Sequence, residues 1–461
     1  MSSTNNKHSY NLSEGSIQKS LIRMTTPMII GMFMLFTFSL VDTLFISFLG
    51  TEALAAISFT FPVTFTIMSL AIGLGIGASA VVGKYLGRSE YEKAKEASTV
   101  INYISLLFAT IVVAICWLFM DSIFHLMGAR ESLMPVIKEY MVVWLPGSIM
   151  IVCIMTGNSI LRACGDTKTP SILMAAAGLI NAVLDPIFIF GIGPMPALGI
   201  QGAAWATIIA WGVVYCCLMY ILVIQKELVS GSLPSRPVMM SSGREMLRIG
   251  VPAAGANMMT PLAAGVMTAI AASFGEEAVA AFGVGARLEP MATLIILAMS
   301  STLPPLISQN FGAGKIDRVE EAYRLAIKFI LGWQMLVYAG LALGAGVIAS
   351  TFSDDPKVIE TIKLFLWILP LGYGMQGIII LTNSSLNALH RPMSALYLSS
   401  ARFFVFYVPL AFVGSQWFGL AGFFGGALCG NLVMATVSLR SFNKAISRER
   451  ATQADFVENT A

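Results

Sequence analysis

The chain has 461 residues, of which 56% are hydrophobic and only 11% are charged, and its formal net charge at pH 7 is +3. Because soluble domains carry roughly a quarter charged residues, this composition excludes an ordinary water-soluble protein. A single buried core cannot absorb so many apolar residues, so a lipid bilayer must be the solvent for most of the surface.

Apolar stretches separated by charged or Gly/Pro-rich breaks predict twelve membrane-spanning helices in an all-α integral membrane protein. A spanning helix needs about 20 apolar residues. In chain order the predicted spans are 25–48, 55–82, 99–120, 136–161, 169–191, 199–224, 247–273, 278–309, 325–351, 359–386, 393–414 and 418–441. The breaks at Gly191–Gly199 and Gly414–Trp417 are the least marked, because they are turn-like and uncharged.

Lysine and arginine concentrate in every second loop, which places those loops in the cytoplasm. The same rule places both termini there, and an even number of spans requires them to share a side. The predicted organisation is a cytoplasmic N-terminal segment (1–24), an N-lobe of six spans (25–224), a cytoplasmic linker (225–246), a C-lobe of six spans (247–441) and a cytoplasmic tail (442–461).

The sequence repeats internally. Phe48–Ala56 matches Ser273–Ala281 at one fixed offset, and the same offset pairs Pro27 with Pro252. The repeating unit is six helices, and because six is even, both copies point the same way across the membrane. We therefore predict two parallel, pseudo-symmetric six-helix bundles with a central cleft, which is typical of transporters. The alternative is a repeat kept for assembly alone, in a channel or a scaffold.

Two carboxylates lie inside predicted spans of the N-lobe, where burying a charge is costly. Asp42 is in the first span, and Asp185 is in the fifth, four residues after Asn181 and therefore on the same helix face. Pro186 has no backbone N–H, so the carbonyl oxygen of Ala182 lacks its helical hydrogen bond and can act as a further ligand beside Asn181 and Asp185. These groups suit a proton relay or a small hydrated cation. The non-functional alternatives are an Asp42 that is solvated by water near the outer membrane interface and an Asp185 that is hydrogen-bonded within its own proline-kinked helix.

The C-lobe does not repeat these acids. Asp42 aligns with Met267, and the stretch that matches Asn181–Asp185 falls near Arg402–Pro409, which contains no acid. The fold of a six-helix unit therefore does not require them, which favours a functional role.

The C-lobe spans carry charges of their own. Arg287 and Glu289 lie two residues apart in the eighth span, so they do not share a helix face, and Arg402 lies in the eleventh. The favoured interpretation is mutual or interhelical pairing that locks helices together. A role in the cavity wall is the alternative.

Two further motifs concern the bending and the packing of helices. Pro27 lies in the first span upstream of Asp42, where it is either a hinge or a harmless proline in the first helical turn. Gly73-Leu-Gly-Ile-Gly77 follows no strand, so it is interpreted as a small-residue face for close helix packing rather than as a dinucleotide-binding loop.

The proline and acid of the first span, together with Asn181-Ala-Val-Leu-Asp185-Pro in a twelve-helix double repeat, resemble the MATE (multidrug and toxic compound extrusion) family, in its DinF-like bacterial branch. The resemblance covers nearly the whole chain. It implies export of drugs and toxins in exchange for protons or sodium ions, with Asp42, Asn181 and Asp185 as coupling residues and Thr207 as their polar neighbour in the sixth span. Other branches carry acids in the seventh and tenth spans, but here the interiors of those spans offer Asn257 and no acid.

The resulting expectation is an antiporter that exports amphipathic organic cations by alternating access, driven by protons or by sodium ions. Ion binding at the N-lobe site bends the first helix near Pro27. We expect a multi-pass monomer in the bacterial inner membrane, surrounded by lipid, with small cationic drugs or dyes as cargo. No nucleic acid, no cofactor and no metal are expected beyond a sodium ion held by Asp42, Asn181 and Asp185.

Three other function classes are weaker. A flippase for lipid-linked precursors or polysaccharides should line its cavity with several cations, but few basic residues lie within the spans. A membrane enzyme needs a catalytic motif, and His8, His125 and His390 form none. A channel differs from a carrier in lacking stoichiometric, gradient-dependent flux.

Overall fold

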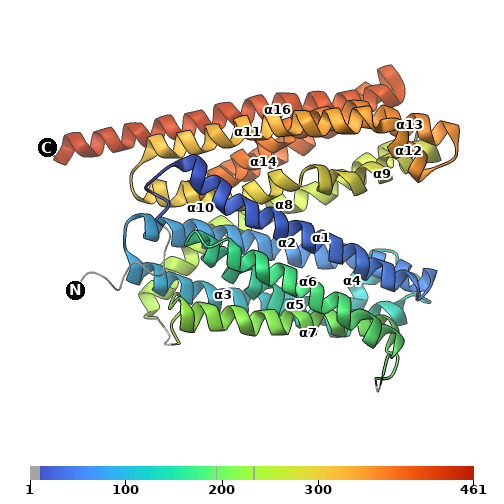
Figure 1. The fold of residues 1–461 in the computed structure, drawn as a ribbon, viewed down its shortest axis with the longest axis horizontal. Helices are drawn as coiled ribbons and strands as arrows, with labels where there is room; N and C mark the ends of the chain where they lie inside the picture. The colour runs from blue at the N-terminus through green and yellow to red at the C-terminus, as the bar shows by residue number, and fades with distance from the viewer. Residues whose placement is uncertain (1–10, 194, 232–233, 461) are drawn as a thin grey trace. The chain divides into compact units, whose positions relative to one another are not determined.

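A computed structural model describes residues 11–193, 195–231 and 234–460, so the start of the predicted N-terminal segment, with His8, lies outside the described residues. The described regular elements are all helical (Figure 1). In chain order they are α1 (Ile17–Ser47), α2 (Thr51–Gly87), α3 (Tyr91–Leu118), α4 (Met120–Leu126), α5 (Met134–Ala163), α6 (Lys168–Phe190), α7 (Gly199–Tyr220), the π-helical η2 (Ile221–Gln225), α8 (Arg236–Ala272), α9 (Glu276–Ala292), α10 (Leu294–Gly312), α11 (Ile316–Leu343), α12 (Ala345–Phe352), α13 (Pro356–Ile368), the 3-10 turn η3 (Leu369–Gly372), α14 (Tyr373–Ala388), α15 (Pro392–Ala401), the π-helical η4 (Arg402–Tyr407) and α16 (Val408–Thr460).

The helices confirm the all-α membrane fold. Eleven continuous helical stretches of the described residues are long and apolar enough to cross a membrane. The last of them, Pro392–Ala454, holds the final two predicted spans, because its backbone leaves the helical region at Phe418 and at Gly419, where φ is 58°. Glycine tolerates such a positive φ without a side-chain clash. The described residues therefore form twelve spans, and the weakly marked predicted break before Phe418 is confirmed.

Several helix boundaries differ from the predicted spans. α1 begins at Ile17 and α8 at Arg236, so both extend into segments that were predicted to lie outside the lobes. Apolar content detects only the part of a helix that lies in lipid, whereas the helix continues through polar turns beyond it. The predicted eighth span is divided at Thr293 into α9 and α10, three residues after Pro290, which lacks a backbone N–H.

The chain divides into two compact units. Residues 26–254 belong to unit 1, whereas 12–25 and 255–460 belong to unit 2. The early segment is fastened within unit 2: the amide of Leu12 donates to Oε1 of Gln309 at 2.9 Å, and Nδ2 of Asn310 donates to the Leu12 carbonyl at 3.0 Å. Residues 12–24, predicted as part of a cytoplasmic segment, are thus built into the second unit.

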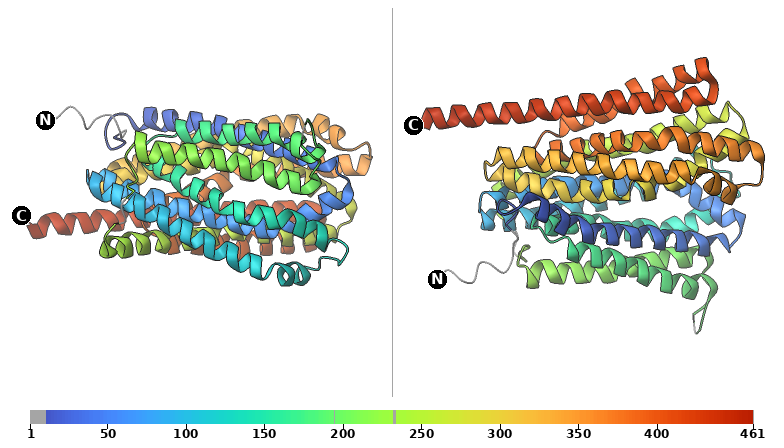
Figure 2. Two further views of the ribbon diagram at one scale, coloured as in Figure 1. Left: turned by 90° about the horizontal axis from the view of Figure 1, so that it is seen from below. Right: turned by 45° about the horizontal axis from the view of Figure 1, so that its top comes forward.

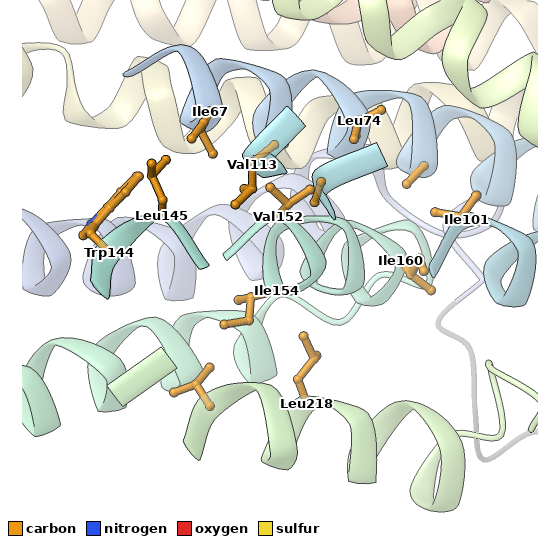
Figure 3. Packing of buried hydrophobic residues seen from close by; sticks show 14 of the residues in the cluster. Ile67, Leu74, Ile101, Val113, Trp144, Leu145, Val152, Ile154, Ile160 and Leu218 are labelled. Carbon is orange, nitrogen blue, oxygen red and sulfur yellow. The ribbon is translucent and has the colours of Figure 1, made fainter. Parts of the chain in front are cut away.

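Helix α5 is the centre of unit 1. It packs against α2, α3 and α7, and α7 in turn packs against α6. Figure 3 shows the apolar side chains that fill these contacts. They are Ile67 and Leu74 of α2, Ile101 and Val113 of α3, Trp144, Leu145, Val152, Ile154 and Ile160 of α5, and Leu218 of α7. This packing fixes the rotation of α5, α6 and α7, which carry four polar residues of the candidate site: Tyr140, Asn181, Asp185 and Thr207.

The Gly73–Gly77 motif packs helices, as predicted. A Cβ at Gly73 would meet the carbonyl oxygen of Gly250 and, at 2.6 Å, the amide of Ala254, both on α8. A Cβ at Gly75 would lie 2.6 Å from Oγ of Ser159 on α5. The glycines therefore let α2 approach two helices more closely than any side chain would allow.

Gly73→Ala is expected to destabilise the protein by about 1–3 kcal/mol, because the new methyl group must push the α8 backbone away. A lower apparent melting temperature in detergent is the readout. The matched control is Gly332→Ala in α11, where a Cβ would meet nothing within 4 Å. Alanine favours a helix over glycine by about 1 kcal/mol, so the control should melt no lower than wild type. Equal apparent melting temperatures for Gly73→Ala and Gly332→Ala would contradict the packing role of Gly73.

Unit 2 is built around α14, which packs against α10, α11 and α16. The ring of Tyr323 on α11 stacks on Phe442 of α16 with centroids 3.6 Å apart. The C-terminal part of α16, red in Figure 2, projects past the other helices of this unit and is tied back by polar contacts. Arg450 contacts Asp317 and Glu320 of α11, each at 2.6 Å.

Candidate functional site

Unit 1 contains a polar centre on α6 and α7. Asp185 is fully buried, and its Oδ1 accepts a hydrogen bond from Nδ2 of Asn181 at 3.1 Å. The same amide nitrogen donates to Oγ1 of Thr207 at 3.3 Å. The Thr207 hydroxyl donates its own proton to the carbonyl of Ala203 at 2.9 Å, so its oxygen is left to accept. These hydrogen bonds fix the orientation of the Asn181 amide and, through it, of the Asp185 carboxylate.

Asp42 of α1 completes the centre. Its carboxyl group neighbours that of Asp185 and interacts with it electrostatically. Oδ1 of Asp42 and Oδ2 of Asp185 are buried and have no hydrogen-bond partner among the described residues. Two adjacent carboxylates cannot both stay ionised in apolar surroundings without a counter-charge. The arrangement can therefore take up a proton or a small cation between them.

Tyr140 of α5 was not among the residues predicted from the sequence. Its phenol lies close enough to both Asp42 and Asp185 to interact with them electrostatically. In the sequence Tyr140 stands near the start of an apolar span beside Glu139, where a tyrosine usually marks the membrane interface. No signal in the sequence distinguishes a Tyr140 at the membrane interface from a Tyr140 beside the two acids.

Two prolines lie inside the helices that carry these acids. Pro186 follows Asp185 within α6, so the carbonyl of Ala182 receives no amide bond from it. Pro27 lies well inside α1, which begins at Ile17. The interpretation of Pro27 as a first-turn proline is therefore wrong, because the helix starts earlier than its apolar stretch. Pro27 also stands next to the boundary between units at residues 25 and 26.

The charges predicted in the C-lobe all lie in unit 2 but do not pair with one another. Oε1 of Glu289 on α9 accepts from Nε2 of Gln376 at 2.7 Å, and Nε of Arg402 donates to Oδ1 of Asn431 at 3.0 Å. These bonds join helices, as expected, but they use amides. Within the described residues neither Arg287 nor Arg402 has an acid within ion-pair distance, and Arg287 is exposed.

Solved structures of similar proteins share this fold. A Vibrio cholerae MATE transporter, VcmN in the bent form, superposes with a TM-score of 0.89 at 33% identity, covering 94% of this chain and 98% of that one. An outward-facing multidrug resistance MATE family transporter superposes with a TM-score of 0.90 at 28% identity, covering 97% of this chain and all of the other.

Curated relatives align over similar lengths. A Shewanella oneidensis protein named FAD transporter is 40% identical over 453 residues, which is 97% of this chain and 99% of the relative. The Staphylococcus aureus multidrug export protein MepA is 26% identical over 417 residues, 90% of each chain.

The MatE family model matches the sequence twice, over residues 27–187 and 252–413. The two matches fall in the two predicted lobes, which supports the internal repeat. Together they cover well over half of the 461 residues. The chain belongs to the MATE family of membrane transporters.

Proposed function

We propose that this transporter exports a small organic molecule across the bacterial inner membrane by alternating access, in exchange for protons, with both termini in the cytoplasm. The supporting observation is the neighbouring pair Asp42 and Asp185, each of which has one buried oxygen with no hydrogen-bond partner among the described residues. Asn181 bonds to Asp185 and to Thr207 and so orients the Asp185 carboxylate. Sodium is the alternative coupling ion, because carboxylate, amide and hydroxyl oxygens can also bind it.

Coupling follows from the position of the two acids on different helices. When both are ionised, their repulsion favours separation of α1 from α6, and a proton that neutralises one of them removes that repulsion. Pro27 interrupts the hydrogen-bond ladder of α1 upstream of Asp42, so α1 can change its bend there. Each proton taken up thus favours one shape of unit 1 over the other.

Two cargo classes have support. The relative with 40% identity is named FAD transporter, which favours a flavin nucleotide as cargo. Relatives at 25–26% identity are named multidrug export proteins, which favours amphipathic organic cations as the second candidate. Neither kind of relative is named for flipping lipid-linked precursors.

The test is transport by the full chain in proteoliposomes under imposed gradients. FAD and ethidium are supplied separately as cargo, and each is measured with a proton gradient, a sodium gradient or neither. We expect cargo movement opposite to the proton gradient and its collapse with a protonophore. Movement that needs neither ion gradient would contradict antiport, and a sodium-only response would assign sodium to the acid pair.

Pro27→Ala is expected to slow gradient-driven transport several-fold, because alanine restores a backbone donor and favours a straight α1 by a few kcal/mol. The initial rate in the same proteoliposomes is the readout. The matched control is Pro62→Ala, which changes an exposed proline inside α2. Transport that falls equally in both variants would show a general effect of helix straightening rather than a hinge at Pro27.

A further inference from the structure

Among its described residues, unit 2 holds a buried arginine, Arg402, that has no acid within ion-pair distance. Arg402 begins the π-helical turn η4, and only 7% of it is exposed. Its Nε donates to Asn431, but its two terminal nitrogens have no hydrogen-bond partner among the described residues. Burying an arginine without a paired acid costs several kcal/mol, so such a residue in a membrane protein calls for a functional reason. π-Helical turns also occur frequently at functional sites.

The surroundings of Arg402 orient its guanidinium without neutralising it. The guanidinium carbon lies 4.7 Å from the centre of the Phe403 ring and 5.8 Å from that of Tyr407. Such cation–π contacts hold the group by its flat face and leave its edge for hydrogen bonding. Glu289 is close enough to interact electrostatically, but its carboxylate is engaged by Gln376 and makes no ion pair with Arg402.

In the repeat, Arg402 corresponds to the acid-bearing stretch of the first half, but it carries the opposite charge. Arg402 lies in the stretch of the second half that corresponds to Asn181–Asp185 in the first. In each unit a polar residue of the fifth span bonds to a polar residue of the sixth: Asn181 to Thr207, and Arg402 to Asn431. Unit 1 thus carries acids where unit 2 carries a cation. An acid centre binds protons or cations, and a cationic centre binds anions.

We propose that Arg402 is a specificity-determining residue that binds the phosphate of the transported molecule, so that the carrier selects aromatic organic phosphates over their uncharged forms. This inference rests on the proposed export of a small organic molecule. A guanidinium presents parallel N–H donors that match two phosphate oxygens, and those of Arg402 are unused. The charge of Glu289, which lies beyond ion-pair distance, weakens the positive potential at Arg402, and this suits a carrier that must also release its cargo.

Equilibrium binding to the purified full chain in detergent tests this without any ion gradient. The probes are FAD, FMN and riboflavin, which share the flavin ring but differ in phosphate. Wild type should bind FAD and FMN more tightly than riboflavin. Arg402→Gln should weaken FAD and FMN binding by about tenfold to a hundredfold, the range for losing hydrogen bonds to a charged group, and leave riboflavin binding unchanged. Arg402→Lys keeps the positive charge but loses the paired N–H donors of the guanidinium, so its affinity for FAD and FMN should lie between those of wild type and Arg402→Gln.

The control variant is Arg440→Gln, which removes an exposed arginine of α16 and should bind all three flavins as wild type does. Unchanged FAD affinity in Arg402→Gln would overturn the inference, as would equal losses for FAD and riboflavin. If Arg402→Gln does not fold, Arg402→Lys decides, and a wild-type preference for FAD over riboflavin in that variant overturns the proposal.

The result also separates this inference from the proposed function. A wild-type chain that shows no preference for phosphorylated flavins but moves ethidium against a proton gradient would overturn phosphate recognition and leave antiport intact. A chain that prefers FAD in the Arg402-dependent way but moves no cargo under any gradient would support recognition and overturn antiport.

Discussion

Asp42→Asn is expected to reduce gradient-driven export to the level of protein-free vesicles. Asparagine has nearly the same shape, but it neither takes up a proton at physiological pH nor offers a carboxylate to a cation. The repulsion between Asp42 and Asp185 would be absent in every state, so the ion gradient would no longer drive a change in unit 1. The measurement is the initial rate of FAD and ethidium transport in proteoliposomes with matched protein content.

The control for this variant is Asp121→Asn in α4. Asp121 is an exposed acid that pairs with Lys138 at 2.9 Å, and exposed pairs contribute about 0–1 kcal/mol. Its transport should match wild type. Drug resistance of cells that express each variant provides a second readout. Wild-type transport rates in Asp42→Asn would remove the basis of the proposed coupling site.

Asp185→Asn is expected to cause the same loss, and the double variant with Asp42→Asn should be no worse than either single one. The two carboxyl groups are neighbours, and in the proposed mechanism they share one proton or cation, so removing either removes the whole binding unit. Residues that act as a unit show such non-additive effects. Asn181→Ala should retain part of the activity, because it removes a supporting hydrogen bond and not a charge.

Where a single variant retains transport above the level of protein-free vesicles, a double-mutant cycle on initial transport rates measures this coupling. Rates in the double variant that equal the product of the two single losses would show that the acids act independently. A nearly normal Asp185→Asn beside an inactive Asp42→Asn would assign coupling to Asp42 alone. Elution as a single species in detergent establishes that each variant is folded.

The amino-acid sequence by itself determined the twelve spans and the residues worth testing. Span content is a local property, because about 20 apolar residues in a row suffice to place a helix in lipid. A charge inside such a stretch stands out for the same reason, so Asp42, Asp185 and Arg402 are recognisable from the sequence alone. Helix ends were harder, since α1 and α8 continue past their apolar parts into polar turns.

Only the tertiary structure decided which of these residues meet. Asp42 and Asp185 lie on helices far apart in the sequence, and Tyr140 joins them from a third. Likewise, the bond from Arg402 to Asn431 and the missing acid partner appear only when α16 is in place. Such contacts depend on how each helix is rotated and how closely it approaches its neighbours. Interlocking side chains and glycines along the whole bundle set that geometry, and no single segment contains it.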